Sequence, residues 1–410
     1  MHDADDCPPA DHALADRFIM PAGTLYLDTA AQGPRLRTVQ AAAQAALEAS
    51  IAPWRLSMPA WEASIESVRT RAAALFDGDG DGDGDGDGDG DGDAVALVPS
   101  AAYGLAIAAR NLPLAAGEAV LVLDGQFPSN LLAWQQRCSE VAARLVAVRR
   151  DHGADWTDAV LAALDADPAI RVLALPQAYW HDGALLDLDR IAVRARAAGA
   201  ALVLDLSQSL GALPADIARW QPDFAVAVGH KWLLGAPGLA YLWVAPRWRE
   251  RGVSIEQHWL ARDGGDGWHF PADRPAPYRA GARRYDAGGV VDPLRLAMAD
   301  AALAQVHAWG VERIATALRA RTTALQTALL DHGLGDWLPR GPRAHFVGVR
   351  PPGAGMLATA VAAMAAAGVI VTARHGLLRF APHLHVGTDD LQRVATIIGA
   401  AARSADRHRG

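Results

Sequence analysis

The chain has 410 residues, 51% of them hydrophobic, and a formal net charge of −8 at pH 7. Nine aspartates of one Asp-Gly repeat, residues 77–93, account for that charge, and without them the chain would carry +1. A nearly neutral body with no basic stripe excludes proteins that track nucleic acid by charge. No apolar run approaches the roughly 20 residues of a membrane helix, so membrane-spanning proteins are excluded as well.

The chain has few groups that could form disulfides or a metal site. Cys7 and Cys138 are its only cysteines, too few for a disulfide framework or a zinc cluster. His383 and His385 lie on one face of an extended segment, but no third metal ligand can be placed, so we expect no metal. The first residues are acidic and polar, unlike a secretory signal. These features predict a soluble protein of the reducing cytoplasm.

The first part of the chain predicts a strand and two helices before the repeat. Residues 24–37 indicate a short strand and a turn, a helix follows to about residue 50, and residues 61–76 place apolar side chains on one helical face. The glycine content and self-repelling charge of residues 77–93 predict a disordered loop. A calcium site is the alternative, but the repeat lacks the terminal glutamate of an EF-hand loop and the apolar positions of nonapeptide repeats.

Beyond the repeat, short apolar strands alternate with helices. The strands are expected at residues 94–98, 119–124, 144–148, 170–175, 201–206, 223–228 and 239–244. This rhythm predicts a doubly wound sheet with helices on both faces. No G-x-G-x-x-G loop follows the first strand, which disfavours a nicotinamide-binding protein. Residues 293–410 read as long helices followed by short strands and more helices, which predicts a smaller α+β domain.

A lysine, Lys231, lies between the last two of these strands. It would be costly to desolvate unless its amine reaches solvent or is held neutral, and a neutral amine is what a Schiff base needs. Asp205 lies near the end of the strand at 201–206, and ligands of open α/β sheets bind at the carboxyl ends of strands. An acid and an amine at one edge fit a pyridoxal phosphate (PLP) site, in which lysine holds the aldehyde and aspartate pairs with the pyridinium nitrogen.

The residues around this pair resemble a known family. Asp205-Leu-Ser-Gln208, and then Gly229-His-Lys-Trp232 before a glycine-proline turn, are similar to the signature of class V aminotransferases. These fold type I PLP enzymes include cysteine desulfurases, kynureninases and isopenicillin epimerase-like proteins. The resemblance runs from about residue 26 to the end. It implies a PLP-binding large domain with a doubly wound mixed sheet at 21–290, after a tail at 1–20, and a small C-terminal α+β domain at 291–410.

The turn after the strand at 94–98 is a candidate phosphate site. Ser100 would cap the next helix, and the small residues Ala101 and Ala102 would leave backbone N–H groups free to bind an anion. Ordinary capping explains Ser100 equally well, but the position of the turn and its similarity to the family's small-residue loop favour phosphate. Phe127, at the end of the next strand, could stack on a pyridine ring; the alternative is a core phenylalanine.

The resemblance implies roles for further residues. His230 is similar to the histidine that contacts the phosphate in desulfurases, and Gln208 to the glutamine that hydrogen-bonds the cofactor's phenolic oxygen. Arg379 stands where relatives bind a substrate carboxylate, for which a guanidinium is suited. Residues 281–289 resemble a segment that in many relatives reaches the partner subunit's phosphate, so we expect a homodimer. The loop of Tyr179, Trp180 and His181 lies beside the cofactor in similar proteins, although aromatic packing explains it as well.

The reaction class is predicted mainly from missing residues. Desulfurases carry a reactive cysteine in their C-terminal part, whereas no cysteine follows Cys138. Kynureninases have tyrosine and histidine where this chain has His230 and Gln208. We therefore expect an enzyme that transaminates an amino acid, with Lys231 as the general base and acid. Epimerase, C–S lyase, kynureninase-like and desulfurase-like reactions remain alternatives, as does a degenerate PLP-fold scaffold without activity.

Overall fold

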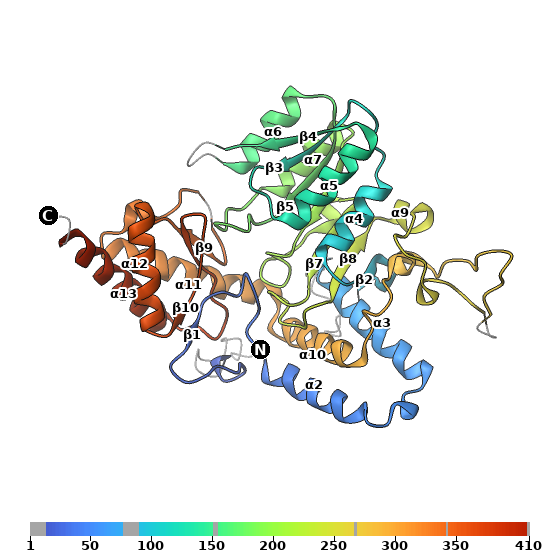
Figure 1. Cartoon of the computed structure of the whole chain (residues 1–410), viewed down its shortest axis with the longest axis horizontal. Coiled ribbons are helices and arrows are strands. Elements are labelled where there is room, and N and C mark those ends of the chain that lie inside the picture. Colours follow the sequence, from blue (N-terminus) through green and yellow to red (C-terminus); the bar gives the residue numbers. More distant parts are fainter. Residues whose placement is uncertain (1–13, 77–89, 151–154, 266–268, 342, 408–410) are drawn as a thin grey trace, which may run out of the picture.

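A seven-stranded mixed sheet forms the centre of the larger lobe (Figure 1). The structure is a computed structural model that describes residues 14–76, 90–150, 155–265, 269–341 and 343–407. The strand order is β2-β8-β7-β6-β5-β3-β4, in which β8 runs antiparallel to both its neighbours and the other pairs are parallel. The strands are β2 (Val95–Val98), β3 (Ala119–Leu123), β4 (Arg144–Val148), β5 (Ile170–Pro176), β6 (Ala201–Asp205), β7 (Phe224–Val228) and β8 (Ala240–Val244).

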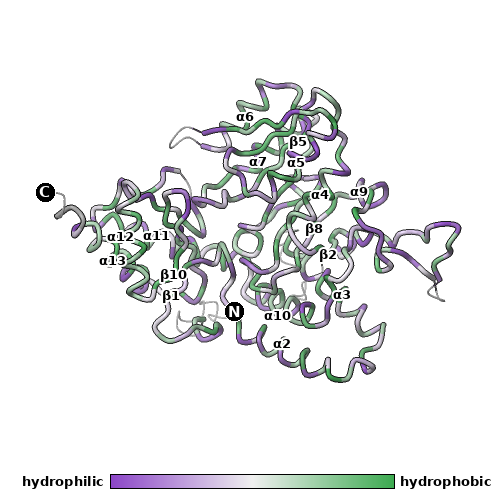
Figure 2. The backbone as a smooth tube through the Cα atoms, in the orientation of Figure 1, coloured by the Kyte–Doolittle hydropathy of each residue, from purple (hydrophilic) through white to green (hydrophobic). Residues whose placement is uncertain are grey.

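Helices cover both faces of this sheet, and the predicted doubly wound architecture is confirmed. Alternate residues of one strand enter different cores: Val95 and Leu97 join one apolar cluster, while Ala96 and Val98 join another, as the two-residue period of a strand requires. Figure 2 shows the hydrophobic colouring along these strands. One face is covered by α4 (Ala101–Asn111) and α5 (Pro128–Val141), and the other by α3 (Met58–Ala74), α6 (Trp156–Ala166), α7 (Leu188–Ala197) and α10 (Pro293–Trp309).

The smaller lobe has its own apolar core. Its antiparallel sheet has the order β11-β12-β9, and the N-terminal strand β1 pairs with β10 of this lobe. Among the residues described, no helix is both long and apolar enough to span a bilayer. The elements are β1 (Leu25–Tyr26), α11 (Val311–Asp331), η5 (Gly335–Trp337), β9 (Val347–Val349), α12 (Gly353–Ala366), β10 (Val369–Ile370), β11 (Thr372–Arg374), β12 (Leu377–Phe380) and α13 (Thr388–Arg407).

Helix α10 packs against α3 and α2 (Arg37–Ala49) of the larger lobe. The predicted domain boundary at residue 291 stays a prediction, since elements on both sides of it contact one another. The turn between α2 and α3 contains η1 (Pro53–Arg55) and exposes large apolar side chains, with Ile51 78% and Trp54 79% accessible. The remaining short helices are α8 (Ile217–Trp220), α9 (Pro246–Arg251), η2 (Gly92–Ala94), η3 (Trp259–Ala261) and η4 (Gly281–Tyr285).

Most of the Asp-Gly repeat, residues 77–89, lies outside the described residues, and so does most of the loop predicted there. The end of the repeat makes contacts that the prediction did not anticipate. Asp91 accepts a hydrogen bond from Nη1 of Arg249 at 2.7 Å, and Asp93 pairs with Arg283. The last aspartates of the repeat are therefore fixed against the larger lobe.

Candidate functional site

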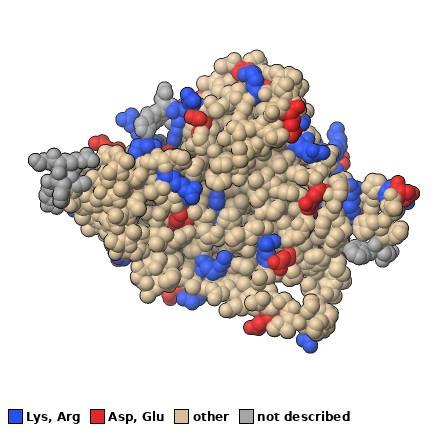
Figure 3. Space-filling model, viewed as in Figure 1, with Lys and Arg blue, Asp and Glu red and all other residues tan. Residues whose placement is uncertain are grey.

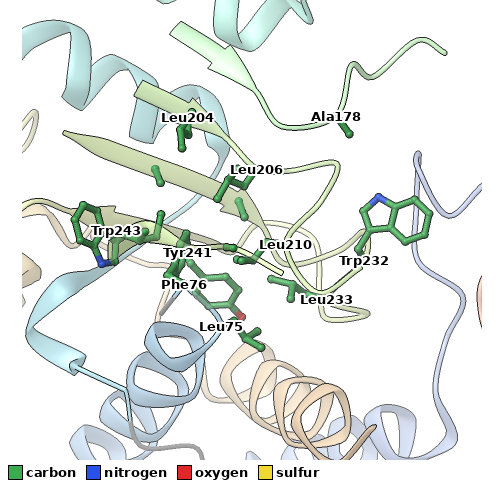
Figure 4. Packing of buried hydrophobic residues seen from close by; sticks show 14 of the residues in the cluster. Leu75, Phe76, Ala178, Leu204, Leu206, Leu210, Trp232, Leu233, Tyr241 and Trp243 are labelled. Atoms are coloured by element: carbon green, nitrogen blue, oxygen red, sulfur yellow. The ribbon is translucent and has the colours of Figure 1, made fainter. Parts of the chain in front are cut away.

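Lys231 lies in the loop at residues 229–239, which joins β7 to β8. Its neighbours Trp232 and Leu233 are buried in the same apolar cluster as Leu206 and Leu210 (Figure 4), so the core holds the loop in place. Leu234 has a left-handed backbone with φ of 57°, a costly conformation for a branched side chain. Such strain persists only where the surroundings enforce it, and here the buried aromatic and leucine side chains do so.

A cavity of about 300 Å³ opens at the carboxyl ends of the strands beside this loop. It brings together eight of the nine site residues predicted from the sequence: Ser100, Ala101, Phe127, Asp205, Gln208, His230, Lys231 and Arg379. The ninth, Ala102, does not line the cavity. Its side chain is exposed in the first turn of α4, so only its backbone could contribute. Strand ends meet at this edge because the sheet is parallel there.

The Lys231 side chain is only 9% exposed, and its Nζ lies 5.2 Å from the centroid of the Phe127 ring. Burial lowers the pKa of Lys231 to about 8, with Asp205 opposing the shift and Arg379 reinforcing it. Roughly one such amine in ten is then neutral at pH 7. Lys231 is also the only lysine of the chain, so no other side-chain amine could hold an aldehyde. A count of lysines would have found this signal in the sequence.

The N-terminus of α4 forms one end of the cavity. Ser100 is its N-cap, and its Oγ accepts a hydrogen bond from the backbone N–H of Tyr103 at 3.1 Å. The free N–H groups of a first helical turn point along the helix axis and carry a partial positive charge. This end of the cavity is therefore suited to an anion such as a phosphate.

Several buried polar atoms of the cavity residues lack a partner. Within the described part of the chain, Nε2 of Gln126, Oγ of Ser207, Nδ1 of His230 and Nε of Arg379 make no hydrogen bond. Leaving such groups unpaired costs about 1–3 kcal/mol each, so a set of them around one cavity indicates a polar ligand. Donors beside a helix N-terminus, a lone amine and a carboxylate are the groups that PLP requires, and the residues present fit this cofactor.

Asp205 and Gln208 hold defined positions in the cavity. Oδ1 of Asp205 accepts a hydrogen bond from the backbone N–H of Ser207 at 3.1 Å, which fixes the carboxylate at the strand end. Nε2 of Gln208 donates to the carbonyl of Ala30 at 2.9 Å, and its Oε1 accepts from Nε1 of Trp232 at 3.1 Å. An amide nitrogen has two hydrogens, so Gln208 retains one N–H that could donate to the cofactor. That contact stays a prediction.

His230 precedes Lys231 and is half-buried. Burial, with a smaller contribution from the positive charge of Lys231, lowers the pKa of His230 to about 4. The ring is therefore neutral at pH 7, and one of its nitrogens can donate a hydrogen bond while the other accepts one. A neutral histidine can contact a phosphate without adding to the positive charge of the cavity.

Arg379 is buried and already paired. Its Nη2 donates to Oδ1 of Asp28 at 2.9 Å, and its Nη1 donates to the carbonyl of Trp180 at 3.0 Å. The sequence did not reveal this pairing. A second guanidinium, Arg374, also lines the cavity and was not predicted. It comes from β11, whose residue Thr372 pairs with Arg379 of β12.

The other predicted residues lie at different places. Trp180 lines the cavity and meets the Phe127 ring edge-on at 5.4 Å, whereas Tyr179 and His181 line a second, separate cavity. The segment 281–289 does not line the first cavity within one chain. Among the described residues, no group of three or more His, Cys, Asp or Glu side chains could hold a metal ion.

Comparison with known proteins places the chain among PLP enzymes. Residues 91–340 match the family model described as "Aminotransferase class-V". The chain is 25% identical over 326 residues to the uncharacterized aminotransferase YcbU of Bacillus subtilis (strain 168), covering 75% of this chain and 78% of that protein. It is 29% identical over 241 residues to kynureninase of Burkholderia mallei (strain SAVP1), covering 57% and 54% of the two chains.

Solved structures share the fold. A C-DES variant with glycine covalently linked to its PLP cofactor superposes with a TM-score of 0.79 at 17% identity, covering 96% of this chain and 99% of that one. The apo cysteine desulfurase of Thermococcus onnurineus NA1 gives 0.80 at 15% identity, covering 96% and 98%. The predicted fold type I is thereby confirmed. Because the family model matches more than half of its residues, the protein belongs to the class-V aminotransferase family and is a PLP-dependent enzyme.

Proposed function

We propose that this enzyme is a cytoplasmic, homodimeric aminotransferase that acts on an amino acid and uses Lys231 as its catalytic residue. The observation that carries the proposal is the position of the only lysine of the chain in one cavity with Asp205. When bound, PLP supplies an aldehyde that captures amines and a ring that withdraws electrons from the α-carbon of the substrate. The protein supplies the groups that position the cofactor and move protons.

The cavity residues divide these tasks by their chemistry. Lys231 would hold the aldehyde, and Asp205 would hold the proton of the ring nitrogen. Phe127 would cover one face of the ring, because the lysine nitrogen already lies 5.2 Å from the centroid of that aromatic ring. The phosphate would lie at the N-terminus of α4, against Ser100 and the neutral His230.

With the substrate bound, the Lys231 amine would take a proton from the α-carbon and return it to another position. A pKa of about 8 suits this role, because a general base works best when its pKa lies near the working pH. Nearby, Arg374 and the unpaired Nε of Arg379 face the cavity. These two guanidinium groups would bind the substrate carboxylate.

Transamination is favoured over sulfur transfer by the position of the thiol. Cys138 lies in α5, where it is 4% exposed and belongs to the apolar cluster on the far side of the sheet from α3. Its Sγ contacts the carbonyl of Arg144 at 3.4 Å, and it does not line the Lys231 cavity. Cys7 lies outside the described residues. A desulfurase-like reaction would need a thiol that reaches the substrate, and Cys138 is directed away from it.

Two features support the assembly and the compartment. The last turn of α2 exposes Leu47, and the segment between α2 and α3 exposes Ile51 and Trp54, each more than 60% accessible. Exposed apolar groups of this size mark contact surfaces. A second copy of the chain is the partner proposed here. The buried free thiol of Cys138 suits a reducing cytoplasm.

The site assignment is tested by borohydride reduction of the PLP-loaded protein, followed by proteolysis and mass spectrometry. The label should appear on the peptide that contains Lys231, and Lys231→Ala should carry none. A label elsewhere, or labelling of the variant, would overturn the assignment.

The reaction class is tested in a single turnover with a panel of amino acids. An aminotransferase should convert the bound cofactor to pyridoxamine phosphate, and a keto acid should restore PLP. Release of pyruvate, ammonia or sulfide with PLP unchanged would replace this proposal with a lyase, and racemised substrate with PLP unchanged would replace it with an epimerase.

A further inference from the structure

A second cavity, of about 600 Å³, lies between the two lobes. We call it the arginine cavity, because its lining includes Arg149, Arg150, Arg340, Arg343 and Arg350. The loop after β5 separates it from the cofactor cavity: Trp180 lines the cofactor cavity, while the adjacent His181 and Asp182 line the arginine cavity. The two cavities therefore share a wall but not their polar residues.

Positive charge exceeds negative charge in the arginine cavity. Among the described lining residues, five arginines face three carboxylates, Asp124, Asp182 and Asp336. One carboxylate serves two guanidinium groups, because Arg150 and Arg343 both bind Oδ2 of Asp182, the latter at 3.1 Å. The other oxygen of Asp182 accepts a hydrogen bond from the backbone N–H of Ala184 at 2.9 Å. Both oxygens of Asp182 are therefore already hydrogen-bonded within the protein.

Two further arginines are left to bind a ligand. In the part of the chain that the structure describes, the side chains of Arg340 and Arg350 make no hydrogen bond or ion pair. Burial lowers the pKa of the neighbouring His181, and the charge of Arg350 contributes to that decrease. On the face shown in Figure 3, Lys and Arg side chains gather where the smaller lobe, on the left, meets the upper part of the larger lobe. The cavity is therefore cationic and can accept further negative charge.

The walls of the cavity suit a small organic anion more than a bare ion. The side chains of Trp156, Tyr179 and Trp337 contribute aromatic surface, and the Arg150 guanidinium stacks on the Trp156 ring at 4.7 Å. A guanidinium binds a carboxylate or a phosphate through two parallel hydrogen bonds. A volume of 600 Å³ is within the range of small-molecule sites.

We propose that the arginine cavity is a second binding site, for a small molecule with two or more carboxylate or phosphate groups. It differs from the amino-acid site and does not depend on the reaction proposed above. The ligand would contact both lobes, since Arg149 and Arg150 follow β4 of the larger lobe whereas Arg340 and Arg350 flank β9 of the smaller one. The lobes already meet here through the N–H of Gly348, which donates to the carbonyl of Asp182 at 3.1 Å.

The proposal is tested with citrate and inorganic pyrophosphate as probes, one for each source of negative charge. Calorimetry and thermal unfolding use the enzyme loaded with PLP, so that the phosphate end of the cofactor cavity is filled, in chloride buffer at constant ionic strength. At least one probe should bind saturably and raise the Tm. The tighter probe identifies the ligand as carboxylate-bearing or phosphate-bearing.

The double variant Arg340→Gln/Arg350→Gln should bind the preferred probe at least tenfold more weakly. These side chains are chosen because they hold no other group in place, whereas Arg150 and Arg343 anchor Asp182. The matched control is Arg190→Gln, an exposed arginine paired with Asp158 on another surface, which should bind as the unmodified enzyme does. Equal affinity of the double variant, no saturable binding of either probe, or binding that disappears on PLP loading would each overturn the proposal.

Discussion

Lys231 and Arg69 are both buried basic residues, but their surroundings shift their pKa values in opposite directions. Arg69 is 1% exposed and makes two parallel hydrogen bonds to Asp286, at 2.9 and 2.8 Å, and a third to the carbonyl of Val95 at 2.7 Å. Although burial alone would lower it, Asp286 raises the pKa of Arg69. Within the described residues, Lys231 has no hydrogen-bond partner for its Nζ, and burial lowers its pKa.

Arg69 has a structural role, whereas Lys231 is available for catalysis, and their hydrogen bonding accounts for the difference. A buried charge that is fully hydrogen-bonded is fixed in one protonation state, so it can hold elements together but cannot exchange protons. A buried charge held away from its counter-ion has a perturbed pKa and remains available for reaction. Asp205 lies in the same cavity as Lys231 but forms no ion pair with it, which preserves that availability.

The largest effect is expected from breaking the structural pair. Arg69→Met would leave Asp286 buried without its partner, and removing one member of a buried pair costs about 3–5 kcal/mol. Asp286 also accepts a hydrogen bond from the N–H of Leu97 in β2 at 2.8 Å, so the edge of the sheet would loosen as well. Urea unfolding of the apo-protein measures the loss.

The control for this experiment is Arg71→Met, on the same helix. Arg71 pairs with Asp300 at 3.0 Å, but both side chains are a third or more exposed, and such pairs contribute about 0–1 kcal/mol. If the two variants lost equal stability, burial of the pair would not be what makes Arg69 important.

The two buried cations also differ in how far the sequence predicts their surroundings. Lys231 and Asp205 were predictable because each follows or ends an apolar strand, and the ends of parallel strands converge on one edge. Arg69 and Asp286 are 217 residues apart, and no local pattern links them. Arg374 was missed for the same reason, since its approach to the cavity depends on how β11 and β12 pack against the larger lobe. The arginine cavity likewise gathers residues from both lobes.

Removing Lys231 should stabilise the protein, whereas removing Arg69 should destabilise it. Lys231→Met in the apo-enzyme should raise the free energy of unfolding at pH 7 by on the order of 1–3 kcal/mol, because it removes a charge that burial disfavours. The unfolded lysine holds its proton up to its ordinary pKa of 10.5, whereas the folded one releases it at about 8. Stability of the unmodified protein therefore rises with pH between these values.

The stability difference between this variant and the unmodified apo-protein should thus be full below pH 8 and disappear towards pH 10.5. Urea unfolding at pH 7, 8.5 and 10 measures it. A variant that is less stable than the unmodified protein at pH 7 would show that Lys231 has a stabilising partner in the folded state.

The smallest effect on stability is expected from histidines that are buried in their neutral form. Burial lowers the pKa of His345 and of His385 to about 4, and that of His383 well below its usual value. The unfolded chain takes up protons at these histidines near pH 6.5 while the folded one does not, so stability falls as the pH drops from 6.5 towards 4. Each histidine contributes at most about 1.4 kcal/mol per pH unit to that slope.

His385→Gln should remove one histidine's share of the slope and leave stability at pH 7 nearly unchanged. Nε2 of His385 lies 2.9 Å from the carbonyl of Tyr26, and a glutamine amide can donate the same hydrogen bond. Urea unfolding at half-unit steps from pH 7 to 4.5 gives the slope, with the exposed His269→Gln as the matched control. An unchanged slope in His385→Gln would mean that His385 takes up its proton at the same pH in the folded and unfolded chains, and that burial does not lower its pKa.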